Sequence, residues 1–171
     1  KNVSATFTLQ QFAMTVTKSG AGSGTVSSTP SGISCGADCF ELFDYGTTVT
    51  LTAIPDAGST FTGWSGACTG IAPCVVSVTS TTNVQASFAL NSYPLTVTKT
   101  GSGGGTVTSS PTGINCGADC TENYTHGTLV TLTATANPGN SFAGWSGACT
   151  GTGSCVVNMI TARSVTATFT F

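Results

Sequence analysis

Eight cysteines are the residues of this chain whose type and spacing could carry chemistry. They form two sets, each a C-x3-C pair followed by a C-x5-C pair: Cys35, Cys39, Cys68 and Cys74, then Cys116, Cys120, Cys149 and Cys155. Four thiols in a small module can form two disulfides or bind one zinc ion. The C-x5-C spacing is looser than usual for zinc, and low charge with many threonines indicates an oxidising compartment. We therefore expect structural disulfides, no metal and no cofactor.

The pairing within each set has three possible solutions. Local pairing, 35 with 39 and 68 with 74, requires turns that bring the Cα atoms within about 7 Å. Gly36 and Gly70 make such turns accessible. On a chain-entropy estimate each short ring contributes roughly 2 kcal/mol, which matters because a module of about 80 residues has a small core.

Few other side chains could bind a metal, since the chain holds one His and six Asp or Glu. Asp38, Glu41 and Asp44 could approach a calcium ion, but Thr125 replaces Asp44 in the second half, so one carboxylate is lost. Calcium takes six or more oxygen ligands. We therefore expect a solvated polar turn.

Catalysis also lacks suitable residues. A general base needs an activated nucleophile and an orienting carboxylate, and His126 has neither nearby in the sequence, so we expect it on the surface. Lys18 and Lys99 could form isopeptide bonds, but outside the cysteine loop no Asn or acid partner is held in register in both halves. We assign no catalytic residue and expect a non-enzymatic protein.

An internal repeat must position the cysteines. The motif GWSGACTG at 63–70 returns at 144–151, a shift of 81 residues (144 minus 63) that also superposes the two cysteine sets. Self-similarity at a fixed shift indicates repeated structural units. The sequence therefore predicts two modules, 12–90 and 93–171.

Apolar residues alternate with threonine along most of each module, as in Val49-Thr50-Leu51-Thr52-Ala53. This period of two is typical of half-buried antiparallel strands, and no window predicts more helix than a short turn near CGADC. The glycine-rich segments 19–24 and 100–105 are interpreted as hairpin turns. We predict an all-β fold of two tandem small antiparallel β modules, β-grasp-like or sandwich-like, each with five or six strands and clamped by two disulfides.

Aromatic residues recur at matching positions of the two modules. Trp64 and Trp145 each lie in an F-x-G-W motif. Aromatic faces can stack on sugars, but a tryptophan in a small disulfide-clamped domain more often lies in the core, with its N–H bonded to a carbonyl. We assign six residues to the core: Phe61, Trp64, Phe88, Phe142, Trp145 and Phe169.

Residues 1–9 repeat the last strand of a module. The segment Asn2–Leu9 matches residues 83–90 and again residues 164–171, so both modules already have their own copy. An unpaired strand edge favours association. We expect residues 1–9 to be the closing strand of a preceding module, earlier in a longer polypeptide or donated to a neighbouring subunit, with Val3, Ala5, Phe7 and Leu9 forming the inter-unit strand.

A family resemblance becomes specific at GWSG, the following Cys149 and Cys155, and the closing Val165-Thr166-Ala167-Thr168-Phe169. Together with Val130–Ala134, these residues resemble the divergent internalin-B-type B-repeat, found in tandem in large bacterial surface and secreted proteins. The resemblance covers essentially the whole chain, and the cysteine pairs resemble the disulfide-bearing subset of that family. It implies a fold similar to the β-grasp group and a spacer, stalk or adhesive role, with no catalytic residues.

Composition excludes other classes, because four Lys or Arg cannot build a nucleic-acid-binding face and no segment approaches the ~18 apolar residues needed for membrane insertion. We expect a structural, extracellular or cell-surface tandem repeat that forms a stalk or a self-assembling fibre. Its partners would be copies of itself or adjacent repeats, joined through β-strand edges. The alternative is an adhesive or carbohydrate-binding module of a larger secreted protein, which would hold a surface glycan or protein ligand on an exposed row: Phe40, Phe43, Tyr45 and Trp64.

Overall fold

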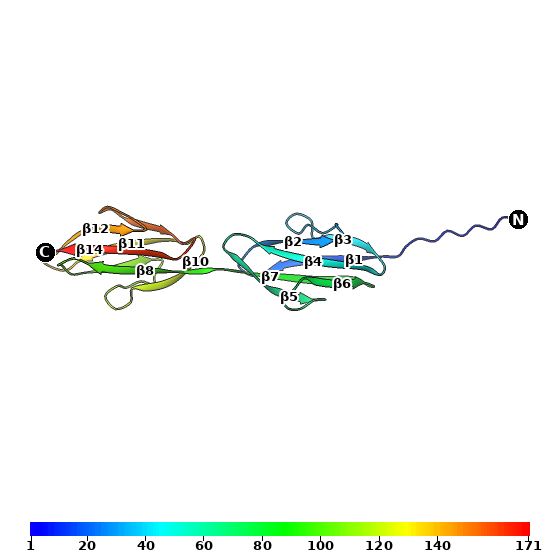
Figure 1. Cartoon of the computed structure of the whole chain (residues 1–171), viewed down its shortest axis with the longest axis horizontal. Coiled ribbons are helices and arrows are strands. Elements are labelled where there is room, and N and C mark those ends of the chain that lie inside the picture. The colour runs from blue at the N-terminus through cyan, green and yellow to red at the C-terminus, as the bar shows by residue number, and fades with distance from the viewer. The chain divides into compact units, whose positions relative to one another are not determined.

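The computed structural model describes residues 1–171, and the chain divides into two units, Lys1–Leu90 and Asn91–Phe171. Each unit contains seven β-strands and no helix (Figure 1). The strands of the first unit are β1 (Gln11–Ser19), β2 (Gly24–Thr29), β3 (Phe40–Asp44), β4 (Thr47–Pro55), β5 (Ser59–Gly66), β6 (Cys74–Val78) and β7 (Thr82–Leu90). Those of the second are β8 (Ser92–Thr100), β9 (Gly105–Ser110), β10 (Thr121–Thr125), β11 (Leu129–Ala136), β12 (Ser141–Gly147), β13 (Cys155–Asn158) and β14 (Arg163–Thr170).

Each unit is a sandwich of a four-stranded and a three-stranded sheet. In the first unit the sheets have the orders β3-β1-β7-β5 and β2-β4-β6, and in the second β10-β8-β14-β12 and β13-β11-β9. All neighbouring strands are antiparallel except the first and last of each unit, β1 with β7 and β8 with β14, which run parallel. The all-β class, the two modules and the antiparallel character are therefore confirmed, and the alternative of a sandwich is the one that forms.

One apolar core lies between the two sheets of each unit, because the period-two pattern turns alternate side chains inward. In the first unit Val16 of β1, Val26 of β2 and Leu51 of β4 are buried, and their counterparts Val97, Val107 and Leu132 are buried in the second. Each unit thus has a complete core of its own, as expected of a module that folds by itself.

The glycine-rich segments are not hairpin turns, and that prediction is wrong. β1 and β2 lie in different sheets, so residues 19–24 carry the chain from one sheet to the other. Gly20 has a φ of 94°, and a Cβ there would lie 2.0 Å from the carbonyl oxygen of Phe88. The N–H of Gly22 donates to this same oxygen at 3.0 Å. Glycine is required because the loop runs directly over the backbone of β7, a contact that the local sequence does not reveal.

The prediction of five or six strands per module was also too low. The short segments at 40–44 and 121–125 pair with β1 and β8 and supply an additional edge strand. The cysteine loop forms a single turn at 35–37, in which the N–H groups of Ala37 and Asp38 donate to the carbonyl of Ser34, and no longer helix forms there, as expected.

Candidate functional site

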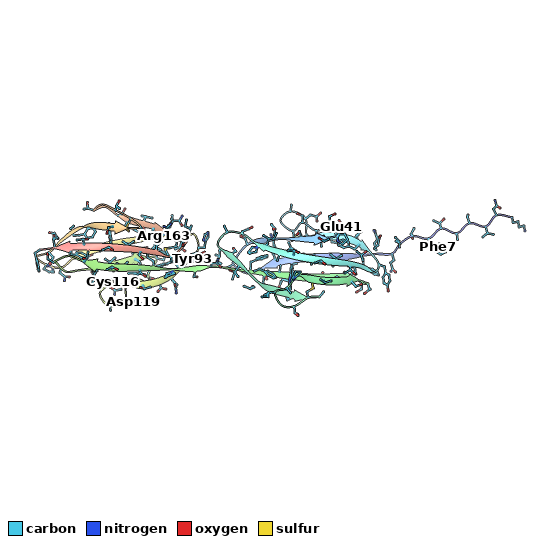
Figure 2. All side chains as sticks on the ribbon, in the orientation of Figure 1. Phe7, Glu41, Tyr93, Cys116, Asp119 and Arg163 are labelled. Carbon is cyan, nitrogen blue, oxygen red and sulfur yellow. A yellow bond between two sulfur atoms is a disulfide. The ribbon has the colours of Figure 1, made fainter.

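The segment before β1 carries an exposed apolar face. Residues 1–10 belong to no strand of this chain, and Val3, Phe7 and Leu9 are 94%, 91% and 74% exposed. Figure 2 shows Phe7 on this segment, away from the sheets of the first unit. Ala5 is exposed as well. An exposed alternating run of this kind resembles a strand without a sheet.

The copies of this segment inside the two units are central strands, not edges. β7 pairs with β1 on one side and with β5 on the other. Val84, Ala86 and Phe88 of β7 are almost fully buried, as are Val165, Ala167 and Phe169 of β14. The residues at these three positions in the N-terminal segment are Val3, Ala5 and Phe7. The segment therefore carries the side chains that complete the core of a unit.

An aromatic cluster lies next to this closing strand in each unit. Trp64 is 5% exposed, and its indole Nε1–H donates to the carbonyl of Ala72 at 2.8 Å. The ring centroid of Phe61 lies 4.9 Å from that of Trp64 and 5.5 Å from that of Phe88. The second unit repeats this cluster, with corresponding centroid distances of 4.8 and 5.5 Å among Phe142, Trp145 and Phe169. Phe61 and Phe142 are half-buried against the cores, and the tryptophans and the closing-strand phenylalanines are buried.

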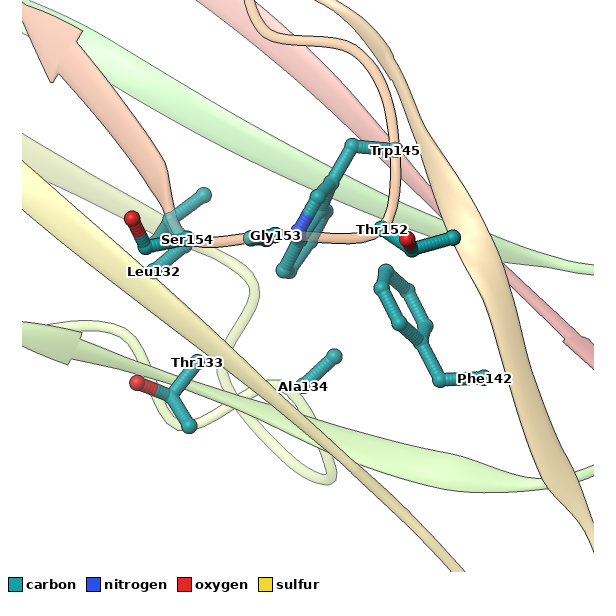
Figure 3. A pocket seen from close by; sticks show the side chains of 8 residues that line it. All are labelled: Leu132, Thr133, Ala134, Phe142, Trp145, Thr152, Gly153 and Ser154. Carbon is teal, nitrogen blue, oxygen red and sulfur yellow. Dashed lines mark hydrogen bonds between the residues drawn. The ribbon is translucent and has the colours of Figure 1, made fainter.

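A pocket opens beside this cluster in the second unit (Figure 3). Its volume is about 240 Å3, and it is lined by residues 132–134 of β11, by Phe142 and Trp145, and by the loop residues 152–154. The corresponding pocket of the first unit is only about 60 Å3, and Ile71 and Pro73 line it. The sequence contained a signal that the motif analysis missed, since Ile71-Ala72-Pro73 is replaced by Thr-Gly-Ser.

All eight cysteines form disulfides in the local pairing: 35–39, 68–74, 116–120 and 149–155. No cysteine is free, so the zinc alternative is excluded. The loop containing Cys35 and Cys39 contacts both sheets, because Cys35 N–H donates to Val26 O of β2 and Cys39 O accepts from Val16 N–H of β1. This bridge therefore ties the two sheets together.

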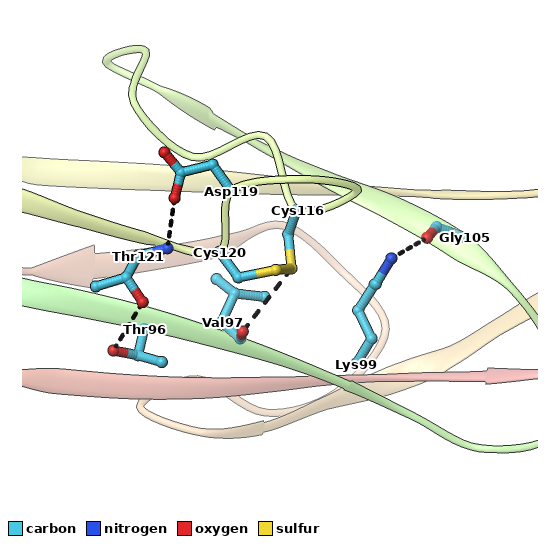
Figure 4. The surroundings of a disulfide bond; sticks show 8 residues. All are labelled: Thr96, Val97, Lys99, Gly105, Cys116, Asp119, Cys120 and Thr121. Carbon is cyan, nitrogen blue, oxygen red and sulfur yellow. Dashed lines mark hydrogen bonds between the residues drawn. A yellow bond between two sulfur atoms is a disulfide. The ribbon is translucent and has the colours of Figure 1, made fainter.

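The second unit repeats this arrangement (Figure 4). Cys116 is fully buried, and its Sγ lies 3.8 Å from the carbonyl oxygen of Val97. This is a van der Waals contact, because a bridged sulfur carries no hydrogen to donate. Lys99 donates from Nζ to the carbonyl of Gly105 at 3.0 Å, as Lys18 does to Gly24 at 2.9 Å. Each lysine thus stabilises the glycine-rich loop that joins the two sheets of its unit, residues 19–24 or 100–105.

The acidic residues do not converge on a metal site. Asp38 accepts from the N–H of Phe40, Glu41 from that of Leu42, and Asp44 from the side chain of Gln11. No three His, Cys, Asp or Glu side chains come close enough together to hold an ion. Each carboxylate shapes its own turn or strand end.

His126 lies at the surface of the second unit but is half-buried there. Its ring centroid lies 6.1 Å from that of Tyr93, and its buried Nδ1 has no hydrogen-bond partner. Its backbone N–H donates to the carbonyl of Asn91. Tyr45 occupies the same position in the first unit and lies against Phe12, with a centroid distance of 6.2 Å. Each unit therefore has an aromatic contact at this position, with an exposed tyrosine in the first unit and a half-buried histidine in the second.

The four residues of the predicted ligand row do not form one exposed surface. Phe40 and Tyr45 are exposed, whereas Phe43 and Trp64 are buried. Phe40 and Phe43 lie three residues apart in β3, so strand alternation turns them to opposite faces, and Trp64 lies in β5.

The family described as the divergent InlB B-repeat domain matches residues 14–92 and 95–171, and the chain belongs to this family. No curated protein matches the chain. Among solved structures, the Bacillus anthracis TIE protein is similar with a TM-score of 0.56 and 8% identity, over 92% of this chain and 34% of that protein. The chain thus spans about a third of that relative, and the likeness concerns the fold alone.

Two pilins show weaker likeness. The major pilin T-13 of Streptococcus pyogenes has a TM-score of 0.39 and 10% identity, over 94% of this chain and 96% of the pilin. The minor pilin GBS52 of Streptococcus agalactiae has a TM-score of 0.32 and 7% identity, over 93% and 95% of the two chains. Similarities this low support no functional argument. All regular elements of this chain are strands, and it has no helix that could span a membrane.

Proposed function

We propose that this chain is a structural, non-enzymatic part of an extracellular or cell-surface protein, in which the β units act as building blocks of a stalk or fibre. Membership of the B-repeat family and four disulfides support this role, because disulfides persist in oxidising compartments. Each unit has its own core, so units can be added in tandem without loss of stability.

The observation that carries the proposal is the exposed segment 1–9, a third copy of the closing strand. This segment packs as the seventh strand of another module, between the strands equivalent to β1 and β5. Burying Val3 and Phe7 there contributes roughly 1.5–3 kcal/mol each, and strand addition supplies main-chain hydrogen bonds as well. The neighbouring module belongs either to the same polypeptide or to another copy, in which case an open head-to-tail contact builds a filament.

The repeat register defines a direct test. Residue 1 aligns with residue 82, so a copy of residues 12–81 placed directly before Lys1 completes a third module. We expect the backbone amides of Val3, Ala5 and Phe7 to exchange with solvent as slowly as those of β7 in this extended chain. In the original chain at low concentration they should exchange rapidly.

The controls change one residue on the face of segment 1–9 that is expected to be buried and one on the face that is expected to be exposed. Phe7→Asp should restore fast exchange in the added module, because a carboxylate cannot be buried unpaired in its core. Ser4→Asp should leave protection unchanged, since its counterpart Gln85 is exposed. Fast exchange of residues 1–9 in the extended chain would contradict the proposal. Assembly of the original chain with rising concentration, measured by sedimentation, would favour the fibre over the stalk.

A further inference from the structure

The pocket beside Trp145 differs from its counterpart in the first unit at only a few positions. Its floor is shared, because Leu132, Thr133, Ala134, Phe142 and Trp145 have identical residues 81 positions earlier. The covering loop differs: Ile71, Ala72 and Pro73 are replaced by Thr152, Gly153 and Ser154. Removing the two apolar side chains accompanies the increase from about 60 to about 240 Å3.

This pocket is uncharged and is lined by apolar side chains on one side and by hydroxyl groups on the other. The half-buried Phe142 and Ala134 present its accessible apolar surface, and the almost fully buried Leu132 and Trp145 also line it, whereas Thr152 and Ser154 place hydroxyl groups on the rim (Figure 3). Neither Thr152 nor Ser154 is held by a side-chain hydrogen bond within the protein, and both are exposed to solvent. No charged side chain lines the pocket. A matching ligand has one apolar face and several hydroxyl groups.

We propose that this pocket binds one neutral pyranose ring of a glycan. The C–H face of such a ring packs against the half-buried ring of Phe142, and its hydroxyls exchange hydrogen bonds with Thr152 and Ser154. The volume of about 240 Å3 lies below the ~300 Å3 at which pockets for drug-sized ligands begin, so the pocket suits a ligand of one ring rather than a longer one. This site is independent of the structural role, which requires only that the units fold and connect.

The two tryptophans provide separate reporters for the two pockets. Each indole N–H donates to a carbonyl of its covering loop, Trp64 to Ala72 and Trp145 to Gly153. The experiment titrates the full chain with the methyl glycosides of glucose, galactose, mannose and N-acetylglucosamine, and follows the two indole N–H signals by NMR. We expect saturable binding in the millimolar range by at least one glycoside, with a shift of the Trp145 signal and none of the Trp64 signal.

Exchanging the loops supplies matched variants. The double variant Thr152→Ile, Ser154→Pro places the apolar side chains of the first unit's loop beside Trp145 and keeps the loop length. It should reduce the Trp145 pocket and weaken binding at least tenfold. The reverse change, Ile71→Thr, Ala72→Gly and Pro73→Ser, should make the Trp64 signal respond as well. A dispersed spectrum identifies each variant as folded, and the opening variant tests the proposal even if the closing variant unfolds.

Several outcomes would overturn the assignment. One is that none of the four glycosides shifts the Trp145 signal, and another is that binding survives closure of the pocket. Equal shifts of both tryptophans in the unchanged chain would show that binding does not depend on the loop. Tighter binding of glucuronic acid would contradict a neutral ligand, and tighter binding of phenol would assign the pocket to apolar molecules instead.

Discussion

The two units have the same strand order and similar cores, and they differ in the loop beside the tryptophan. Nearly all buried positions correspond across the repeat, from Val16 and Val97 in the first strands to Phe88 and Phe169 in the closing strands, and Val157 is buried where its counterpart Val76 is half-buried. The loop beside the tryptophan differs, and so does one aromatic position of the core edge, where Phe43 is replaced by Tyr124. Core positions are constrained by packing from both sheets, whereas the loop faces solvent on one side and is free to acquire a separate property.

The tyrosine shows how a difference in the core is accommodated. In the first unit the hydroxyl of Ser28 donates to the carbonyl of Pro30 at 2.7 Å. In the second, the hydroxyl of Tyr124 lies 2.8 Å from that of Ser109 and donates to the carbonyl of Pro111 at 3.3 Å. The added hydroxyl is inserted into an existing hydrogen bond, so no buried polar group is left without a partner.

Removing the closing-strand phenylalanine should have the largest effect on this comparison. Phe88→Ala and Phe169→Ala each leave a cavity in one core and should cost about 3–5 kcal/mol of the free energy of unfolding of that unit. Because the cores are separate, Phe88→Ala should lower the transition of the first unit only. Calorimetry with both variants measures this, and a fall of both transitions in either single variant would show that the units do not unfold independently.

Breaking one disulfide should have an intermediate effect that is equal in the two units. Replacing Cys35 and Cys39 by serine, or Cys116 and Cys120, opens a ring of the same length and should cost about 2 kcal/mol in the affected unit. Urea unfolding of each variant measures this loss. Very different losses in the two units would indicate that the bridges support their surroundings unequally.

The tyrosine exchange should have the smallest effect. Tyr124→Phe removes the inserted hydroxyl, and Ser109 can then donate to Pro111 as Ser28 does to Pro30, so we expect a loss of about 0.5–1.5 kcal/mol. Phe43→Tyr should be tolerated to within a similar amount, because Ser28 and Pro30 are already in place. Urea midpoints measure both changes. A loss of unfolding free energy above this range would mean that the Tyr124 hydroxyl stabilises the second unit through more than its bonds to Ser109 and Pro111.

Much of the fold could be predicted from particular residues. The alternation in Val49–Ala53 predicted strands, because side chains of a strand point alternately to its two faces. The burial of Trp64 and its hydrogen bond to a carbonyl also follow from its type, since an indole N–H in a core needs an acceptor. The hairpin interpretation of residues 19–24 was wrong, because a glycine-rich turn looks the same whether it joins paired strands or crosses between sheets.

The sequence by itself determined the repeat and the β class, and it showed that residues 1–9 repeat the sequence of the closing strand, because all three are patterns along the chain. Only the tertiary structure decided that β7 lies between β1 and β5, that the cysteine loop joins two sheets, and that the pocket beside Trp145 is larger than its counterpart beside Trp64. These features depend on contacts between residues far apart in the chain. The loop side chains at 71–73 and 152–154 change the pocket volume only because the fold places them beside a tryptophan and the strand of the other sheet.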